Sequence, residues 1–464
     1  RRPPRSTQSR SSAASDVYKR QGLDVANAAA ASDLRVALVE KGPLGGTCLN
    51  RGCIPSKIII HSADIAMAIR RAADFGLHVK GLEVDFAAIT ARASRLVDED
   101  SEGIEHALTH HVKNPRLIKG EATFIGKKTL RVSGQELKAD RILIATGTRP
   151  HVPDIPGLRE AGYITSDEAL RLQVQPKELI ILGGGYIAAE LGHFFGALGT
   201  HVTVVHRRAV LLRQEDTEVA EKFTEVFARY YTVLTDSLPV EVRREGDRLV
   251  LTVENRLSGQ RSEVAGDTLL VATGRTPNTD MLNLDATGVK VDDKGFVRVK
   301  ETLETDVKGI YALGDVVGRY LYKHNANHEA QYAYWNMVLG REIPVDYSVM
   351  PHAVFSYPQV AGVGLTEQEC QAQGIDYAVG RYEYADTGMG TALQERDGFV
   401  KVIARRSDGK ILGCHIIGPE ASTLIQEAVV AMKSGEGKIR NILNSIHVHP
   451  ALPEVLARAA AALQ

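Results

Sequence analysis

The chain has 464 residues, with 56 Lys and Arg against 57 Asp and Glu, and its formal net charge is −1. This length is enough for two to four domains with large cores, and the balanced charge indicates neither a nucleic-acid partner nor an anionic membrane surface. The sequence has no uninterrupted apolar run that we expect to span a bilayer. Its four cysteines are too few for a disulfide scaffold, which fits a reducing, cytoplasmic compartment.

The first residues of the chain do not match the pattern that follows them. Residues 1–21 contain six Arg or Lys, five Ser and a single acid, so we predict a non-native or disordered amino terminus. Gly22 opens a helix-like run, and a strand-like run over residues 34–40 ends at Glu40. In a dinucleotide-binding βαβ unit, Gly22 would be the third glycine and Glu40 the acid that binds a ribose. We expect a first strand and two further glycines before Gly22, and residues 1–21 do not supply them.

The segment 45–57 carries Cys48 and Cys53 behind a glycine pair and just before Pro55, which suits the first turn of a helix. At this spacing in an ideal helix, two Cα atoms lie roughly 8–9 Å apart, beyond the ~7 Å limit for a disulfide. A bond between them therefore needs a distorted turn, which Gly52 permits, and strained disulfides are readily reduced. We interpret the segment as a dithiol/disulfide switch for two electrons. Unlinked buried thiols or a structural disulfide are the alternatives, and the spacing predicts no metal site.

Coarse periodicity predicts the remaining organisation. Residues 57–111 have a helical pattern with a break over 76–84, and residues 116–144 are strand-like. Residues 246–273 alternate as in an antiparallel meander, and from about residue 344 strands and then helices are expected.

A second glycine turn follows the apolar strand over residues 179–182. Small residues at Gly183, Gly185 and Ala188 fit the G-x-G-x-x-A pattern, which places a pyrophosphate at a helix amino terminus. An acid after the next strand would select NAD, but this chain has arginines there, which favour the 2′-phosphate of NADPH over NADH. These arginines are Arg207, Arg208 and Arg213.

Two further features of the sequence are an internal repeat and two additional cysteines. Residues 145–149 are echoed at residues 272–275, which suggests two related nucleotide-binding domains. Cys370 follows a capping-box pattern and is expected on a helix, while Cys414 lies in an apolar strand-like run. We expect both of these cysteines to be packing residues.

Near the carboxyl end, the segment 447–454 contains two histidines and a glutamate, and a histidine held by a carboxylate can exchange protons at neutral pH, although a His-x-His-Pro segment by itself is more often structural. His447 is expected to have a structural role. The run that ends at Asp315 is, by itself, typical of a strand followed by a Gly-Asp turn.

Taken together and in this order, these motifs resemble those of the FAD-containing pyridine nucleotide–disulfide oxidoreductases, the family of glutathione reductase and dihydrolipoamide dehydrogenase. The resemblance implies an α/β fold with two Rossmann-like domains, for FAD and NAD(P), and a C-terminal α+β dimerisation domain. The implied ranges are 22–150 and 276–343 for FAD, 151–275 for NAD(P), and 344–464 for dimerisation.

The resemblance also implies roles for individual residues. Cys53 would face the flavin, and Cys48 would attack a small-molecule disulfide. His449, oriented by Glu454, would protonate the departing thiol in the partner's active site of a homodimer. Lys57 would lie near the flavin and pair with Glu190, and Tyr186 would cover the flavin on the nicotinamide side. The implied FAD-binding residues are Gly22, Glu40, Gly46, Thr47, Lys57, Ala122, Thr146, Gly147 and Asp315. The implied NADPH-binding residues are Gly183, Gly185, Tyr186, Ile187, Glu190, Arg207, Arg208, Arg213 and Gly274.

Within the family, local segments are similar to mycothione reductase, so we expect reduction of a mycothione-like disulfide with NADPH. Gln331 stands where glutathione reductase has a substrate-binding arginine, and the chain lacks the carboxyl-terminal cysteine pair of mercuric reductase. Dihydrolipoyl dehydrogenase activity with NAD is the main alternative. A flavin- or nucleotide-binding protein without turnover is a further alternative, because the first strand is missing.

Overall fold

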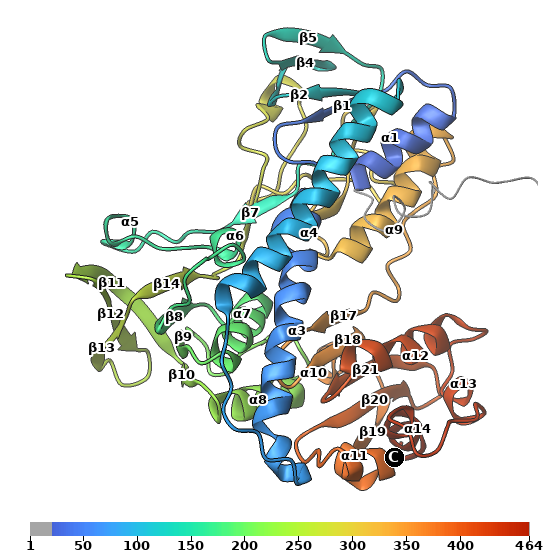
Figure 1. The fold of residues 1–464 in the computed structure, drawn as a ribbon. Helices are drawn as coiled ribbons and strands as arrows, with labels where there is room; N and C mark the ends of the chain where they lie inside the picture. Colours follow the sequence, from blue (N-terminus) through green and yellow to red (C-terminus); the bar gives the residue numbers. More distant parts are fainter. Residues whose placement is uncertain (1–20, 464) are drawn as a thin grey trace, which may run out of the picture. The chain divides into compact units, whose positions relative to one another are not determined.

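The computed structural model describes residues 21–463, so the predicted non-native segment 1–21 lies outside the described residues except for its last position. The chain is an α/β protein made of two compact units (Figure 1). Of the described residues, the first unit contains those from Gln21 to Pro55, Ser94–Arg149 and Arg275–Val345. The second contains Ser56–Ala93, Pro150–Gly274 and the chain from Asp346 onward.

The first unit contains two parallel strand pairs, β1 with β2 and β6 with β16, and an antiparallel sheet in the order β3-β4-β5. Its buried core includes Phe124, Ile142 and Ile310. The strands are β1 (Ala37–Glu40), β2 (Arg116–Lys119), β3 (Ala122–Gly126), β4 (Thr129–Val132), β5 (Gln135–Lys138), β6 (Ile142–Ile144), β15 (Arg275–Pro277) and β16 (Ile310–Ala312), and β7 (Thr148–Pro150) ends this part of the chain. The helices are α1 (Gln21–Ala31), α2 (Gly46–Arg51) and α9 (Lys323–Ala333), with short turns at Leu284–Ala286, Gly314–Val316 and Tyr334–Val338.

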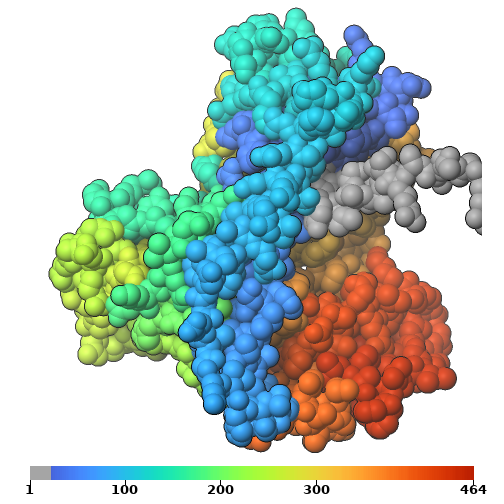
Figure 2. Space-filling model, viewed as in Figure 1, coloured from blue at the N-terminus to red at the C-terminus, as the bar shows by residue number. Residues whose placement is uncertain are grey.

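The long helical stretch after the cysteines is confirmed. It consists of α3 (Cys53–Arg70), a 3₁₀ turn (Ala72–Phe75), α4 (Phe86–His106) and a π turn (Ala107–His111), with the expected break before α4. One side of α4 forms part of the molecular surface in Figure 2, and its Arg95 and Glu99 side chains are about two-thirds exposed.

One helical stretch of the described residues, Gly46–Arg70, is long and apolar enough to cross a membrane, with a hydropathy of 1.3. It is not an uninterrupted apolar run, because Arg51, Lys57 and Asp64 carry charged side chains within it. In this structure Ile59, Ile60 and Ala63 of α3 are packed in the hydrophobic core of the second unit.

The second unit contains a parallel sheet in the order β10-β9-β8-β14, with buried α7 beside it and an antiparallel sheet β11-β12-β13. The elements are α5 (Leu158–Ala161), α6 (Ser166–Ala169), β8 (Glu178–Leu182), α7 (Tyr186–Ala197), β9 (His201–Val205), α8 (Thr217–Ala228), β10 (Thr232–Leu234), β11 (Ser237–Glu245), β12 (Arg248–Asn255), β13 (Arg261–Gly266) and β14 (Thr268–Val271). The expected meander over 246–273 is therefore wrong at its end. β14 leaves it and pairs in parallel with β8, because Leu269, Leu270 and Val271 form a continuous apolar run suited to a strand buried on both faces.

The carboxyl-terminal part of the second unit is an antiparallel sheet in the order β17-β18-β21-β20-β19, packed against α12 and α14. Cys370 lies on α10 behind a complete capping box, and Cys414 lies on β21; both are fully buried, as expected. The elements are β17 (His352–Val354), β18 (Val360–Gly364), α10 (Glu367–Ala372), β19 (Tyr377–Glu383), a 3₁₀ turn (Tyr384–Asp386), α11 (Gly388–Ala392), β20 (Phe399–Arg405), β21 (Ile411–Ile417), α12 (Ala421–Lys433), α13 (Arg440–Leu443) and α14 (Pro453–Ala461).

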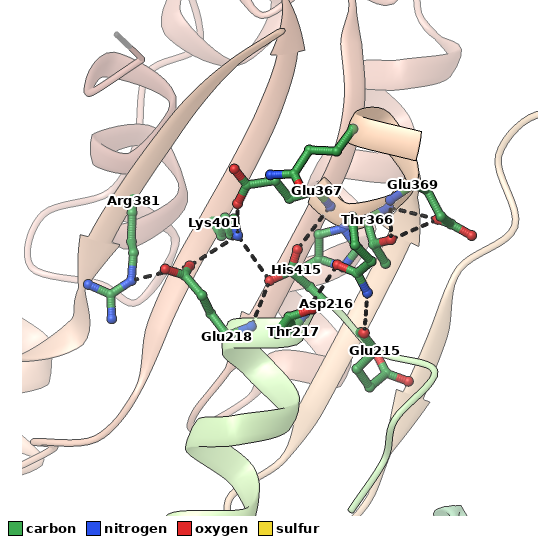
Figure 3. A network of polar contacts seen from close by, with 12 residues as sticks. Glu215, Asp216, Thr217, Glu218, Thr366, Glu367, Glu369, Arg381, Lys401 and His415 are labelled. Atoms are coloured by element: carbon green, nitrogen blue, oxygen red, sulfur yellow. Dashed lines mark hydrogen bonds and ion pairs between the residues drawn. The ribbon is translucent and has the colours of Figure 1, made fainter. Parts of the chain in front are cut away.

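A buried lysine joins the carboxyl-terminal sheet of this second unit to α8 and α10 (Figure 3). Lys401 on β20 is 1% exposed in its side chain and contacts Asp216 at 3.0 Å, Glu218 at 3.0 Å and Glu367 at 2.5 Å. Asp216 is also the N-cap of α8 and accepts the backbone N–H of Glu367 at 3.0 Å. A buried ammonium group needs such carboxylate partners, so Lys401 fixes the start of α8 against β20 and α10.

We expect Lys401→Met to lower the free energy of unfolding by about 3–5 kcal/mol, because it leaves the buried carboxylate of Asp216 without its cation. Urea denaturation followed by circular dichroism measures this loss. The matched control is Lys433→Met, which removes an exposed 2.6 Å ion pair with Asp346 and should cost at most about 1 kcal/mol. Equal losses in the two variants would contradict the role assigned to Lys401.

Candidate active site

The two cysteines of the expected redox pair lie at a junction between helices in the first unit. Cys48 is on α2, Cys53 is the first residue of α3, and both are free thiols. Gly52 lies between the helices with φ −146° and ψ −116°. A Cβ atom on Gly52 would lie 2.9 Å from the carbonyl oxygen of Thr47, so the close turn that brings the cysteines together requires glycine.

The thiols of Cys48 and Cys53 are hydrogen-bonded to each other. A hydrogen bond with Cys53, burial and the charge of Cys53 all raise the pKa of Cys48, whereas the positive charge of Lys323 lowers it. Burial lowers the pKa of Lys323, and the two cysteines and Asp24 partly oppose this change. Lys323 is the first residue of α9, and it is not among the site residues predicted from the sequence. The segment that contains Lys323 is similar to mycothione reductase. Its local sequence does not indicate that Lys323 lies near the cysteines.

Two of the expected flavin-binding residues lie at the carboxyl ends of parallel strands, where ligands of such sheets bind. Glu40 ends β1 and accepts the Gly42 N–H at 2.8 Å. Asp315 follows β16 and accepts the Thr148 hydroxyl at 3.0 Å. Burial raises the pKa of Asp315, although Thr148 and Arg275 act in the opposite direction.

The segment after β6 completes this edge of the unit. Gly147 has φ +66° and open space where a Cβ would lie, and Asn278 binds the carbonyl groups of Thr146 and Gly147. A Cβ on Gly22 of α1 would lie 3.4 Å from Ala145, so the expected third glycine packs against this segment. The other expected flavin-binding residues are Gly46 and Thr47 at the start of α2 and Ala122 at the start of β3. The glycines, the open space and the buried Asp315 fit a flavin nucleotide.

The second glycine turn has the close packing that a dinucleotide site needs. Gly183 has φ +125°, and a Cβ on it would lie 2.2 Å from the carbonyl oxygen of Ala272. A Cβ on Gly184 would lie 2.5 Å from the ring of His206, whereas Gly185 faces open space. α7 then begins at Tyr186 and Ile187 with no capping side chain and no acid in its first turn among the described residues. The amino terminus of a helix that follows such a turn suits a pyrophosphate.

The arginines beyond β9 are exposed. Among residues 21–463 no carboxylate forms an ion pair with the guanidinium groups of Arg207, Arg208 or Arg213, so all three are available to an anion. Burial, followed by the charges of Arg207, Arg213 and Arg208, lowers the pKa of His206. Gly274, with φ +131°, also borders open space.

Lys57 and Glu190 form the ion pair that the resemblance implies. The ammonium group lies 2.7 and 2.8 Å from the two carboxylate oxygens, and the side chains are 35% and 12% exposed. The backbone N–H of Phe355 donates to Glu190 at 3.1 Å, and the Lys57 ammonium group is 4.5 Å from the Phe355 ring centroid. The pair therefore links α3, α7 and the segment after β17 within the second unit.

His449 and Glu454 are also paired. The two carboxylate oxygens of Glu454 lie 2.9 and 3.1 Å from Nδ1 of His449. The hydrogen bond with His449 is the main reason that the pKa of Glu454 is lowered. The His449 side chain is 74% exposed, so its other ring nitrogen is accessible. His447 instead contacts Glu427 of α12 at 2.7 Å, which fits the structural role expected for it.

Across residues 21–463, no group of His, Cys, Asp and Glu could hold a metal ion. The site residues fall into the two units. The cysteines, Lys323 and the expected flavin-binding edge belong to the first, and the Lys57–Glu190 pair, the second glycine turn and the His449–Glu454 pair belong to the second.

Known proteins match this chain over most of its length. Residues 22–332 match the family model described as pyridine nucleotide-disulphide oxidoreductase, and residues 350–460 match the dimerisation domain of that family. The chain is 37% identical over 439 residues to mycothione reductase of Mycobacterium tuberculosis, covering 92% of this chain and 94% of the relative. It is 35% identical over 444 residues to dihydrolipoyl dehydrogenase of Chlamydia pneumoniae, covering 95% of this chain and 94% of that relative. A solved structure, the Cu(II) complex of the HOCl-induced flavoprotein disulfide reductase RclA from Escherichia coli, matches with a TM-score of 0.84 and 25% identity, covering 95% of this chain and 97% of that one.

We expect Lys323→Met to slow alkylation of Cys48 by iodoacetamide several-fold at a given pH, because losing the cation raises the pKa of this thiol further and only the thiolate reacts. Peptide mapping by mass spectrometry of the reduced protein separates Cys48 from Cys53. Lys300→Met is the control, since Lys300 lies in the same unit and pairs with Glu304. An unchanged or faster reaction of Cys48 would contradict the assignment.

Proposed function

We propose that this chain, which belongs to the pyridine nucleotide-disulphide oxidoreductase family, reduces a low-molecular-weight disulfide with electrons from NADPH. It is an FAD-dependent enzyme that uses NAD(P). The observation that carries the proposal is the dithiol of Cys48 and Cys53 on the Gly52 turn. When bound, FAD conducts two electrons between the nicotinamide and the dithiol.

The residues of the chain divide the disulfide chemistry between them. The Cys48 thiolate attacks the substrate disulfide, which forms a mixed disulfide and releases one thiolate that His449 protonates. Cys53 then attacks the Cys48 sulfur, which releases the second thiol and forms the Cys48–Cys53 disulfide. Two electrons and two protons are thereby delivered to the substrate, and two electrons from the coenzyme restore the dithiol. His449 would come from a second copy of the chain in a homodimer, as the exposed imidazole and the match to a dimerisation domain support.

For the substrate we propose a mycothione-like disulfide. The similarity to mycothione reductase, the arginines after β9 and Gln331 support this assignment. Dihydrolipoyl dehydrogenase activity with NAD is the second candidate, favoured by relatives of nearly equal identity.

We expect NADPH oxidation to be fastest with mycothiol disulfide in a panel that also contains lipoamide and glutathione disulfide, because Gln331 cannot supply the cationic contact expected for glutathione. Loss of nicotinamide absorbance measures the rate.

Cys48→Ser should abolish disulfide reduction and leave reduction of the bound flavin by NADPH intact, since only the attacking sulfur is removed. Activity with lipoamide alone would remove the mycothione assignment, and turnover by the Cys48→Ser variant would contradict the dithiol mechanism.

We expect Arg208→Ala to raise the KM for NADPH about tenfold, which is about 1.4 kcal/mol of a charge-assisted contact with the 2′-phosphate. The KM for NADH should change less than about twofold, because NADH lacks that phosphate. Steady-state rates with the two coenzymes measure the difference. Arg261→Ala is the control, because Arg261 is an exposed arginine of β13 that pairs with Glu254. A clear preference of the wild-type protein for NADH would refute the assigned role of the arginines.

A further inference from the structure

The first residue of α7 is held by a buried carboxylate. The Tyr186 hydroxyl donates to Glu215 Oε1 at 2.6 Å, and the Glu215 side chain is 1% exposed. Tyr186 directly follows Gly185 of the dinucleotide turn. The ring is therefore attached at one end to the turn and at the other to Glu215.

The second oxygen of Glu215 is bound by a histidine from the carboxyl-terminal sheet. His352 Nε2 lies 2.7 Å from Glu215 Oε2, and the rings of His352 and Tyr186 are stacked with their centroids 6.2 Å apart. Burial acts to raise the pKa of Glu215, but the hydrogen bonds from His352 and Tyr186 and the nearby histidine charges outweigh it, so the pKa is lowered. Glu215 is thus an ionised carboxylate with a donor on each oxygen.

Gly362 makes room for this histidine. His352, Gly362 and His415 are in register across β17, β18 and β21. A Cβ on Gly362 would lie 2.8 Å from the His352 ring and 3.1 Å from His415 Nδ1. Any larger residue at position 362 would displace the imidazole that reaches Glu215.

The backbone around Glu215 is fixed as firmly as its side chain. Gln368 of α10 donates to the Glu215 carbonyl at 2.8 Å, and Asp216 is held by Lys401 (Figure 3). On the other side, the Leu212 N–H donates to the carbonyl of Gly184 at 2.7 Å. The carboxylate therefore has a defined position relative to the dinucleotide turn.

We propose that Glu215 and His352 are positioning residues for the coenzyme, which fix the Tyr186 ring beside the dinucleotide turn. This inference rests on the proposed function, since it requires that NAD(P)H binds at Gly183–Gly185. Without the hydroxyl contact, the ring gains rotamer freedom, and binding must order it again. Losing the contact therefore weakens coenzyme binding while the thiol chemistry stays intact.

The test is Tyr186→Phe, which keeps the ring and removes only the donor. We expect the dissociation constant of NADP⁺, measured by calorimetry on the holoenzyme, to rise about five- to tenfold. The KM for NADPH should rise similarly, with kcat and the KM for the disulfide within about twofold of wild type. Glu215→Leu should have an effect at least as large, and the double variant should be no weaker than the stronger single variant, because both changes remove the contact of the Tyr186 hydroxyl.

Tyr384→Phe is the matched control, because Tyr384 is a fully buried tyrosine of the same unit whose hydroxyl donates to the Pro419 carbonyl at 3.0 Å. Its coenzyme affinity should equal that of the wild type. Wild-type affinity in Tyr186→Phe, an equal loss in Tyr384→Phe, or multiplicative effects in the double variant would each overturn the inference while the proposed function stands. A wild-type holoenzyme that binds neither NADP⁺ nor NAD⁺ would overturn the proposed function as well.

Discussion

The chemistry of this protein depends on one steric constraint, the approach of the chain at Gly52 to the carbonyl oxygen of Thr47. No side chain fits there, and the approach is what allows Cys48 within α2 to meet Cys53 at the start of α3. A continuous helix would hold the sulfurs too far apart to exchange a bond. The break between α2 and α3 is thus a functional feature of the backbone, and the long α3 that follows anchors it in a packed core.

In the second unit, polar groups that are normally exposed are buried at the segment between β9 and α8. Asp216 turns toward Lys401 and the carboxyl-terminal sheet, and Glu215 turns toward Tyr186 and His352. Each charge is fully paired, which is the condition for burying it without a large loss of stability. Two adjacent carboxylates therefore serve separate purposes, one for stability of the unit and one for geometry at the glycine turn.

Sequence patterns predicted those parts of the structure that depend on local chemistry. The capping box before Cys370, the strand at Cys414 and the helix break before α4 are set by nearby residues and were predicted correctly. β14 was assigned to the wrong sheet, because periodicity cannot distinguish a buried parallel strand from the end of a meander.

Contacts between distant segments could not be predicted in this way. The charge of Lys323 acts on the pKa of Cys48, and His352 contacts Glu215, only through tertiary packing, which the local sequence around neither residue indicates. The Lys57–Glu190 pair was anticipated from the family resemblance alone, since nothing in its spacing along the chain indicates a contact.

The burial of Cys370 and Cys414 has a practical consequence. Both side chains are inaccessible, and burial raises the pKa of each thiol, so neither reacts readily in the native protein. The chain has four cysteines in all, and the remaining two are the half-buried Cys48 and Cys53. The number of thiols that a reagent titrates without denaturant therefore reports the oxidation state of the redox pair directly, because Cys370 and Cys414 do not contribute to it.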